Sequence, residues 1–527
     1  MWWSWWHACN QMHEHVGQVP ILIVMTALAV LWFAWTNKKS RKASPRLPPG
    51  PWGLPIVGYL PYLGTDLHKE FTQLAKIYGP IYKLWLGSKL CMVVSSPSLV
   101  KEVVRDHDLT FTNRDPPIAG KIVTYGGNDI VFQAYGSVWM KLRKIFVSQM
   151  LGNSVLDGLY SLRREQVKNS IRQVYGKAGT PVDVSKLAFL TAFNASLSMF
   201  WGGSLQQDQA DYGAQLRNAA TEIMVLIGSP NISDIFPPLA WFDIQGIEKQ
   251  MKALFGIFDR IFDSAIEQRK KIMAAAKAED RQPQRNEERK DFLQFLLDLN
   301  ENENSATSIT IAQLKGMLMV IVVGGTDTTS TMVEWTIAEL IQHPDIMHKV
   351  REELIQVVGL NNWVEEFHLP KLTYLNAVIK ETCRLHPALP LLVPRCPSDS
   401  RTVGGYLVPK GTRIFINAWS IHRDPSVWDN PLEFMPERVL NDPSKFDFYG
   451  NSFEYLPFGS GRRMCAGLPL GERMLIYILA SFLHCFEWKM PVGVKLELSD
   501  KFGIVTKKMV PLVAVPTPRL PNLELYA

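Results

Sequence analysis

The stretch FGSGRRMCAG, residues Phe458–Gly467, holds one cysteine between glycines, close behind two arginines. Zinc sites need paired Cys or His residues at short spacing, and no second Cys or His lies within ten residues of Cys465. A disulfide would need a partner and an oxidising compartment. The six cysteines, at positions 9, 91, 383, 396, 465 and 485, follow no regular framework. We therefore expect reduced and mostly structural thiols, with Cys465 as the exception that its surroundings must explain.

The residues after Cys465 predict a helix. They read AGLPLGERMLIYILASFLHCF, which places Cys465 near a helix N-terminus, where the dipole and the free N–H groups favour a thiolate. Arg462 and Arg463 add positive charge, and Gly461 and Gly467 omit side chains where a flat group has to approach. A cysteine thiolate is one of the ligands that hold haem iron, and it favours cleavage of the O–O bond. The stretch therefore predicts a haem ligated by Cys465.

A long helix is predicted over residues 308–343, with Ser308 or Thr310 as its N-cap. Its middle, Met317–Val323, is apolar on all sides, which indicates burial. A second membrane span is the alternative, but charged residues on both sides leave too short an apolar run. The pattern favours the central helix of a large domain.

That helix contains Gly324-Gly325-Thr326-Asp327-Thr328-Thr329. Two adjacent glycines cost about 1 kcal/mol each inside a helix, so they indicate a local opening or a close approach to the backbone. An acid beside an alcohol in an apolar setting is costly unless both are satisfied. Two interpretations stay open: a kinked helix with Asp327 in a salt bridge, or an acid–alcohol pair that relays protons beside a small-molecule site.

Three further charged residues form a candidate network. Glu381 and Arg384 are spaced i, i+3 on a helix that must stop near Pro387. Arg438 follows in a proline-rich loop. If Arg438 reaches Glu381, the three form a buried ionic network, which fixes geometry more surely than it adds stability.

The N-terminal region predicts a membrane anchor. Residues 19–35 are apolar and uncharged, residues 1–18 contain no Lys or Arg, and a basic cluster follows at 38–42. By the positive-inside rule, the short N-terminus at 1–17 is lumenal and the chain beyond the anchor at 18–36 is cytosolic. The basic n-region and small-residue cleavage site of a signal peptide are missing.

The rest of the chain reads as one large globular domain. The chain has 527 residues, 47% of them hydrophobic, and a net charge of +6. A basic and proline-rich linker at 37–51 leads into a mostly helical domain at 52–527, with short strands near 91–94 and 413–417. Without a zinc-finger pattern or a sustained basic stripe, no nucleic-acid partner is expected. The charged stretch 275–307 is expected to be an exposed helix end and loop.

Taken together, these motifs resemble the cytochrome P450 family, in its plant microsomal form, over essentially the whole chain. The haem-loop pattern F-x-x-G-x-R-x-C-x-G is matched in full by Phe458, Gly461, Arg463, Cys465 and Gly467. The weaker family patterns are matched by Gly324–Thr329, by Glu381 and Arg384, by the Pro-Glu-Arg loop at 436–438, and by Trp139 and Arg143 as W-x-x-x-R.

The resemblance implies a mainly α fold with small β-sheets, a single large domain behind a transmembrane helix. It implies an iron protoporphyrin with Cys465 as the proximal ligand, in a loop formed with Phe458, Gly461 and Gly467. Asp327 and Thr328 would deliver protons to dioxygen. Glu381, Arg384 and Arg438 would brace the haem loop without taking part in catalysis. The haem propionates would be held by Trp139, Arg143, Arg463 and Arg395.

The resemblance also places the substrate pocket, and its expected lining is nearly all aliphatic. An apolar pocket binds an apolar molecule by desolvation. We therefore expect insertion of one oxygen atom from O2 into a small apolar plant metabolite, with a mono- or sesquiterpenoid favoured. The alternative is a flavonoid or other phenolic, because the chain also resembles flavonoid hydroxylases as well as geraniol hydroxylases. The expected lining residues are Ile122, Val123, Val320, Val323, Gly324, Leu391, Leu392, Val393, Ile504 and Val505.

Electrons must come from another protein, because the chain has no G-x-G-x-x-G dinucleotide fingerprint. The resemblance implies NADPH–cytochrome P450 reductase, docked on the cysteine side near Lys141, Lys144 and Arg462, and a single-pass location in the endoplasmic reticulum membrane. Two rival classes stay open. A haem sensor without turnover would not need the Asp327–Thr328 pair, and an anchored interaction protein would hold no haem.

Overall fold

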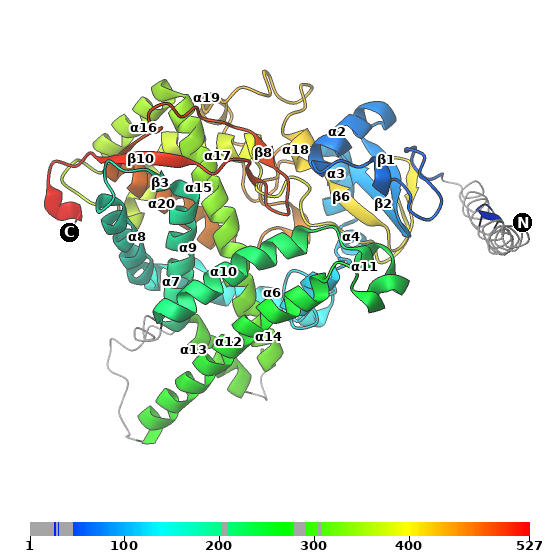
Figure 1. Ribbon diagram of the computed structural model, residues 1–527, viewed down its shortest axis with the longest axis horizontal. Coiled ribbons are helices and arrows are strands. Elements are labelled where there is room, and N and C mark those ends of the chain that lie inside the picture. Colours follow the sequence, from blue (N-terminus) through cyan, green and yellow to red (C-terminus); the bar gives the residue numbers. More distant parts are fainter. Residues whose placement is uncertain are drawn as a thin grey trace, which may run out of the picture.

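The computed structural model describes residues 26–27, 30, 46–202, 209–278, 291–302 and 307–526. These residues form a large helical part with a smaller sheet-containing part on one side (Figure 1). The mainly α fold with small sheets is confirmed. The predicted anchor at 18–36 lies outside the described residues, apart from three isolated positions.

The smaller part is built on a three-stranded sheet. Strands β1 (Ile81–Leu86) and β2 (Lys89–Val94) form an antiparallel pair. Strand β6 (Arg413–Ile416), more than 300 residues later, joins β2 in parallel, with Cys91 opposite Arg413. Both predicted strands are therefore confirmed, and they are direct neighbours. Arg46 is tied to this part of the molecule, because its carbonyl accepts from the N–H of Leu407 at 3.0 Å.

The helices and remaining strands complete the frame of the site. The other sheets have the orders β3-β10-β7, β4-β5 and β8-β9. Their strands are β3 (Val182–Asp183), β4 (Arg401–Val403), β5 (Tyr406–Val408), β7 (Phe486–Lys489), β8 (Asp500–Lys501), β9 (Lys507–Lys508) and β10 (Val513–Pro518). The helices outside the core pair described next are α2 (Leu67–Tyr78), α3 (Pro97–Lys101), α4 (Asp108–Phe111), α5 (Ile118–Val123), α6 (Ser137–Lys144), α7 (Asn153–Gly158), α8 (Tyr160–Tyr175), α9 (Val184–Trp201), α10 (Gln209–Gly228), α11 (Ile232–Ile235), α12 (Ile247–Ala278), α13 (Phe292–Glu301), α16 (Pro344–Val357), α17 (Thr373–Leu385), α18 (Ala418–Ile421) and α19 (Glu437–Asn441).

The predicted central helix is present and is interrupted where the glycines indicated. Helix α14 (Ile311–Met319) passes through one π-helical segment, Val320–Gly324, into α15 (Gly325–Gln342). A π-segment widens the helix locally and is often found at functional sites. Thr310 is the N-cap, in a capping box with Gln313. The expected opening therefore lies directly before the Thr-Asp-Thr sequence.

Two helical segments among the described residues are long and apolar enough to cross a membrane: the one from Ile311 to Gln342, and α20 (Leu468–Cys485). In both, 78% of the most apolar window is buried inside the protein. They form the core of the helical part, where α15 packs against α9 and α20. The segment from Ile311 to Gln342 is therefore a core helix, as the sequence predicts.

The charged stretch 275–307 is more structured than expected where the structure describes it. Helix α13 buries Phe292, Leu293, Leu296 and Leu297. Asp291 caps this helix through the N–H of Gln294 and pairs with Arg269 at 2.6 Å. The prediction of a loop was wrong here, because four apolar residues with helical spacing outweigh the surrounding charges.

Candidate active site

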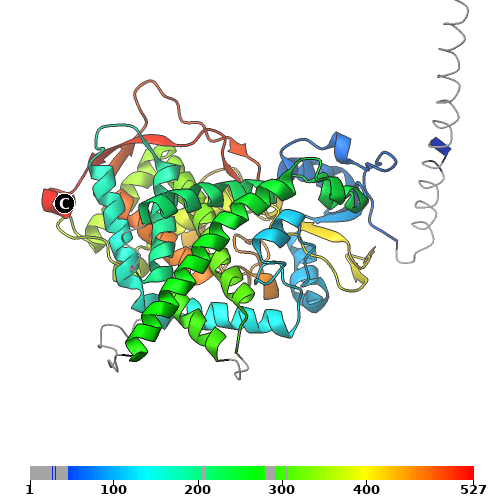
Figure 2. The ribbon, with the colours of Figure 1, turned by 60° about the horizontal axis from the view of Figure 1, so that its bottom comes forward.

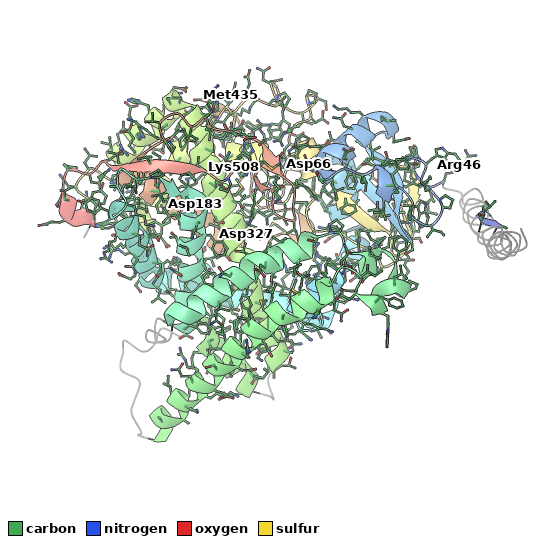
Figure 3. All side chains as sticks on the ribbon, viewed as in Figure 1. Arg46, Asp66, Asp183, Asp327, Met435 and Lys508 are labelled. Carbon is green, nitrogen blue, oxygen red and sulfur yellow. The ribbon has the colours of Figure 1, made fainter. Side chains whose placement is uncertain are left out.

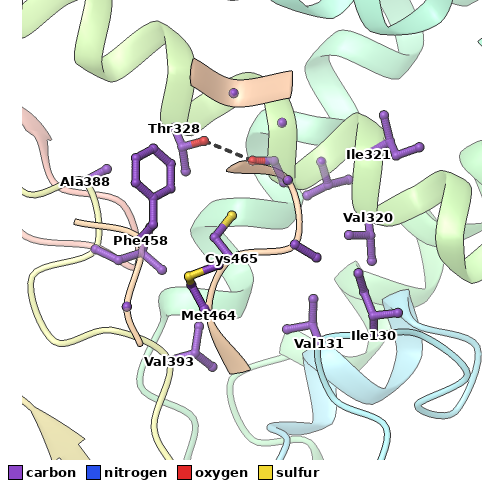
Figure 4. A pocket seen from close by; sticks show the side chains of 18 of the residues that line it. Ile130, Val131, Val320, Ile321, Thr328, Ala388, Val393, Phe458, Met464 and Cys465 are labelled. Carbon is purple, nitrogen blue, oxygen red and sulfur yellow. Dashed lines mark hydrogen bonds between the residues drawn. The ribbon is translucent and has the colours of Figure 1, made fainter. Parts of the chain in front are cut away.

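A cavity of about 350 Å³ lies between α15, the Cys465 loop and the segment that follows α17. Figure 4 shows Cys465, Met464 and Phe458 in the loop before α20, and Thr328, Val320 and Ile321 on the central helix. Ile130 and Val131 close one side of the cavity, and Ala388 and Val393 close another.

The cysteine loop is closed by its own backbone. The N–H of Cys465 donates to the carbonyl of Phe458 at 2.9 Å, directly before α20. Gly461 has φ +71°, and a Cβ at this position would lie 2.3 Å from the carbonyl oxygen of Val104. Gly461 is therefore required by packing of the loop against the rest of the protein, not by the approach of a flat group as expected. At Gly467 a Cβ would lie 3.7 Å from the Cys465 sulfur, so glycine keeps the space beside the sulfur open.

Cys465 lines this cavity and is exposed rather than packed in the core. Burial raises the pKa of its thiol, against the lowering effects of the Gly467 and Leu468 N–H groups and of Arg143. The predicted lowering effect of the helix-end N–H groups on this pKa is therefore present, but burial outweighs it. Arg462 does not contribute, because it turns outward and pairs with Asp108 at 3.0 Å. A bound metal ion would deprotonate the thiol as it binds.

Four arginines converge on the same cavity: Arg114, Arg143, Arg395 and Arg463. Burial lowers the pKa of each, to about 10 for Arg395 and Arg463, and the neighbouring arginines contribute to the lowering for Arg114 and Arg463. One carboxyl among the lining residues, Asp129, accompanies them, and burial raises its pKa to about 6.

The donors of these arginines are only partly used by the protein. Arg463 donates to the carbonyls of Thr112, Ile130, Val131 and Gln133, at 2.6–3.3 Å. Arg395 donates to Ser460, and Arg143 to Met464. The Nε of Arg114 is buried without a hydrogen-bond partner. Four buried guanidinium groups, one of them with a nitrogen donor that no protein group accepts from, fit a cofactor that carries two carboxylates.

Trp139 is buried but does not line the cavity. Its indole N–H donates to the carbonyl of Ile130 at 3.0 Å. Its ring lies 4.4 Å from the guanidinium carbon of Arg463 and 5.5 Å from that of Arg143. Trp139 therefore holds two of the cavity arginines through cation–π contacts.

The acid–alcohol pair of α15 is divided between two environments. Thr328 faces the cavity and donates to the carbonyl of Gly324 at 3.0 Å (Figure 4). Asp327 does not line the cavity; its Oδ1 pairs with Lys507 of β9 at 2.6 Å, and its Oδ2 is buried without a partner. Figure 3 places Asp327 among the helices of the larger part. The salt bridge expected under the first interpretation is present, and Lys507, whose side chain is 35% exposed, connects Asp327 to the surface. The proton-relay interpretation stays a prediction.

The predicted ionic network is present behind the cysteine loop. Glu381 and Arg384 form a two-fold hydrogen-bonded pair at 2.8 Å, and both side chains are fully buried. Arg438 approaches Glu381 at 3.3 Å. Arg384 also donates to the carbonyls of His422, Pro431 and Glu433, so the pair anchors the chain that leads to the cysteine loop.

Most of the predicted pocket residues line the cavity, and three do not. Those that line it are Val123, Val320, Val323, Gly324, Leu392, Val393 and Ile504. Leu391 and Val505 are buried elsewhere, and Ile122 packs against the main core. A Cβ at Gly324 or Gly325 would meet no atom within 4 Å, which leaves this part of α15 open towards the cavity.

Sequence reasoning missed Arg114, Lys507 and the contribution of α10, which adds Met224 and Ile227 to the lining. A single arginine in a loop carries no spacing signal, so no feature of the sequence distinguishes Arg114. The apolar face of α10 could have been found by its helical periodicity.

The helical fold places a cysteine and four arginines around one cavity, which suits a cofactor with two negative charges that binds through a metal to the cysteine. The sequence model described as Cytochrome P450 matches residues 48–513, and the chain belongs to this family. Its members are oxidoreductases that use haem with a cysteine thiolate, dioxygen and electrons from a redox partner.

Several plant proteins are similar over nearly the whole chain. A flavonoid 3',5'-hydroxylase of Solanum melongena is 36% identical over 97% of this chain and 98% of its own length. A flavonoid 3'-monooxygenase of Crocosmia x crocosmiiflora is 38% identical over 95% and 98%. A carnosic acid synthase of Salvia fruticosa is 37% identical over 95% and 99%. Among solved structures, a zebra fish cytochrome P450 with progesterone has a TM-score of 0.73 and 27% identity, covering 86% of this chain and all of that chain.

Proposed function

We propose that this monooxygenase hydroxylates a flat phenolic plant metabolite of the flavonoid class. The observation that carries this proposal is the set of relatives named for flavonoid hydroxylation, which align over 95–97% of the chain at 36–38% identity. It reverses the preference for a terpenoid that the sequence analysis drew from the aliphatic lining.

Cys465 is proposed as the iron ligand, because it is the exposed one of the two cysteines that line the cavity and Gly467 keeps the space beside its sulfur open; Cys383, the other, is buried in α17. Arg114, Arg143, Arg395 and Arg463, with Trp139 behind them, are proposed to hold the two haem carboxylates; charge-assisted pairs of this kind are strong in a buried site. Phe458 and Gly461 shape the loop, and Glu381, Arg384 and Arg438 brace it. When bound, the haem supplies the activation of dioxygen.

The proposed proton path uses this chain's own residues. Lys507 is partly exposed and contacts Asp327, and the next residue, Thr328, presents its hydroxyl to the cavity. A buried carboxylate held by one cation, with its second oxygen unpaired, can pass a proton inward and be recharged from the surface. General acid catalysis of this kind typically contributes a factor of about 10² or more.

The substrate side of the cavity offers apolar walls with a few hydroxyl groups. Thr328 donates to a carbonyl of its own helix, so its oxygen still has lone pairs free to accept from a phenol. Thr124 also lines the cavity, but its oxygen already accepts from the N–H of Gly127 at 3.2 Å. Val123, Val320 and Ile504 provide aliphatic surface that a flat ring system covers by desolvation.

A terpenoid substrate is the second candidate. It is favoured by the aliphatic side chains of Val320, Val323 and Ile504, and by the similarity to carnosic acid synthases. We further propose an endoplasmic reticulum location, with the predicted anchor at 18–36, and NADPH–cytochrome P450 reductase as the electron donor. Of the predicted docking cations, Lys141 donates to the Ser308 carbonyl and Arg462 pairs with Asp108, whereas Lys144 is exposed.

The test is incubation of membranes that contain the protein and the reductase with NADPH and two substrate panels, one of flavanones and flavones, the other of mono-, sesqui- and diterpenes. We expect a product with one added oxygen from the flavonoid panel. Products from the terpene panel alone would overturn the flavonoid proposal and favour the second candidate. Consumption of neither panel, with an intact haem spectrum, would favour the sensor.

A further inference from the structure

Helix α5 supplies one wall of the cavity and ends on an unusual residue. Val123 and Thr124 line the cavity, and Tyr125 directly after them has φ +53°. Gly126 and Gly127 continue with φ +80° and +89°. A bulky residue in this left-handed region carries strain of about 1 kcal/mol or more and persists only where its surroundings hold it. Tyr125 itself does not line the cavity.

The Tyr125 side chain is held by groups from two other helices. Its hydroxyl donates to Oδ1 of Asp259 on α12 at 2.9 Å, and its ring meets Phe255 edge-on with centroids 4.7 Å apart. Lys315 of α14, whose side chain is 8% exposed, contacts the same Asp259 oxygen at 2.7 Å and Asp263 at 2.6 Å. The Lys315 ammonium also lies 5.7 Å from the centre of the Tyr125 ring. Figure 2 shows the long helix α12 crossing this face of the molecule.

Both ends of α5 are tied to the same part of the chain. At its start, the N–H of Ile118 donates to Asp234 of α11 at 2.8 Å, and at its end Tyr125 reaches Asp259 of α12. The loop beyond Tyr125 is held as well, since a Cβ at Gly316 of α14 would lie 2.3 Å from the Asn128 carbonyl oxygen. The position of Val123 and Thr124 therefore depends on contacts made outside the cavity.

We propose that Tyr125, with Asp259 and Lys315, is a positioning cluster that fixes the α5 wall and thereby sets how tightly the cavity holds an aryl-sized apolar group. This proposal rests on the assignment of the cavity to the haem site. A wall that is already ordered lowers the entropy cost of ligand binding. Loosening the wall should therefore reduce the affinity for ligands that contact it and leave the affinity for smaller ligands unchanged.

The test uses two azoles that coordinate haem iron and differ in size, imidazole and 4-phenylimidazole, titrated by the shift of the Soret band in the full-length holoprotein. Tyr125→Phe keeps the ring and its contact with Phe255 but removes the hydrogen bond to Asp259. We expect the Kd of 4-phenylimidazole to rise about fivefold to tenfold, somewhat less than the full contribution of one hydrogen bond to a charged group, because the bond acts on the cavity through the α5 wall. The Kd of imidazole should change less than about twofold.

Tyr160→Phe is the matched control, because the Tyr160 hydroxyl also bonds to a carboxylate, that of Glu365, without contributing to the cavity. It should leave both Kd values unchanged. Asp259→Ala should reproduce the effect of Tyr125→Phe, and the double variant should be no weaker than either alone.

An unchanged Kd ratio in Tyr125→Phe would overturn the proposal, and so would an equal shift in Tyr160→Phe. Absence of a Soret band from the purified wild-type protein would instead contradict the haem site itself.

Discussion

The two sides of the cavity are built from different kinds of interaction. On the cysteine side, four arginines and the buried Glu381–Arg384 pair hold the chain through charged hydrogen bonds. On the substrate side, α15, α10 and α5 present mostly aliphatic surface. Polar networks demand one geometry, whereas aliphatic walls tolerate substitution if the volume is kept. The first side therefore defines the class of reaction, and the second side leaves room for different substrates.

The largest effect is expected at the buried ion pair of the cysteine side. Glu381→Ala leaves the fully buried Arg384 without its carboxylate, which typically costs about 3–5 kcal/mol. We expect a large loss of folded holoprotein, measured by urea unfolding and haem content. Glu248→Ala removes an exposed pair with Lys252 and should cost less than about 1 kcal/mol. Equal effects would contradict the contrast between the buried network and the surface.

A smaller effect is expected where the two sides meet. Thr328→Ala removes the hydroxyl that faces the cavity, and product formed per NADPH should fall by a factor on the order of 10², with peroxide formed in its place. Thr326→Ala serves as the control, because this hydroxyl is fully buried on the same helix and bonds to the Val322 carbonyl. Unchanged coupling in Thr328→Ala would remove Thr328 from the proton path.

Arg114 tests whether the arginines of the cysteine side hold the cofactor, because its Nε is buried without a hydrogen-bond partner in the protein. Arg114→Gln should speed loss of haem to an acceptor protein about tenfold, the effect of losing a charge-assisted hydrogen bond. Arg473→Gln, which removes an arginine paired on the outside with Asp157, should not change this rate. Equal rates for both variants would show that Arg114 holds no carboxylate of the cofactor.

The smallest effect concerns pH. Burial, then Arg384 and Arg423, lower the pKa of His422 from 6.5 to about 3, and its Nε2 accepts the N–H of Leu456. Because the unfolded chain binds this proton first, stability is lost as pH falls below about 6.5. Between about pH 7 and pH 5.5 the loss should reach about 1 kcal/mol. Urea unfolding at both pH values should show this loss in the wild type relative to His422→Gln; identical pH dependence would contradict a buried neutral His422.

The cysteine side could be predicted from sequence because its signals are local. Cys465 and Gly467 lie close together in the sequence, as do Glu381 and Arg384. The β-branched residues of β2 and β6 predict these two strands. Arg114 and Lys507 could not be predicted, because each lies in a loop or short strand that is distant in sequence from the residues it joins. For the Cys465 thiol, the sequence indicated the lowering effect of the helix-end N–H groups on the pKa but not the larger raising effect of burial, because burial cannot be read from local spacing.

The most direct measurement is a carbon monoxide difference spectrum of the reduced, membrane-expressed protein, with wild type beside Cys465→Ala. The predicted result is the strongly red-shifted Soret band of a haem thiolate in the wild type and its disappearance in the variant. A haem spectrum that Cys465→Ala leaves unchanged would show that another residue ligates the iron and would contradict the assignment on which the whole account of the site depends.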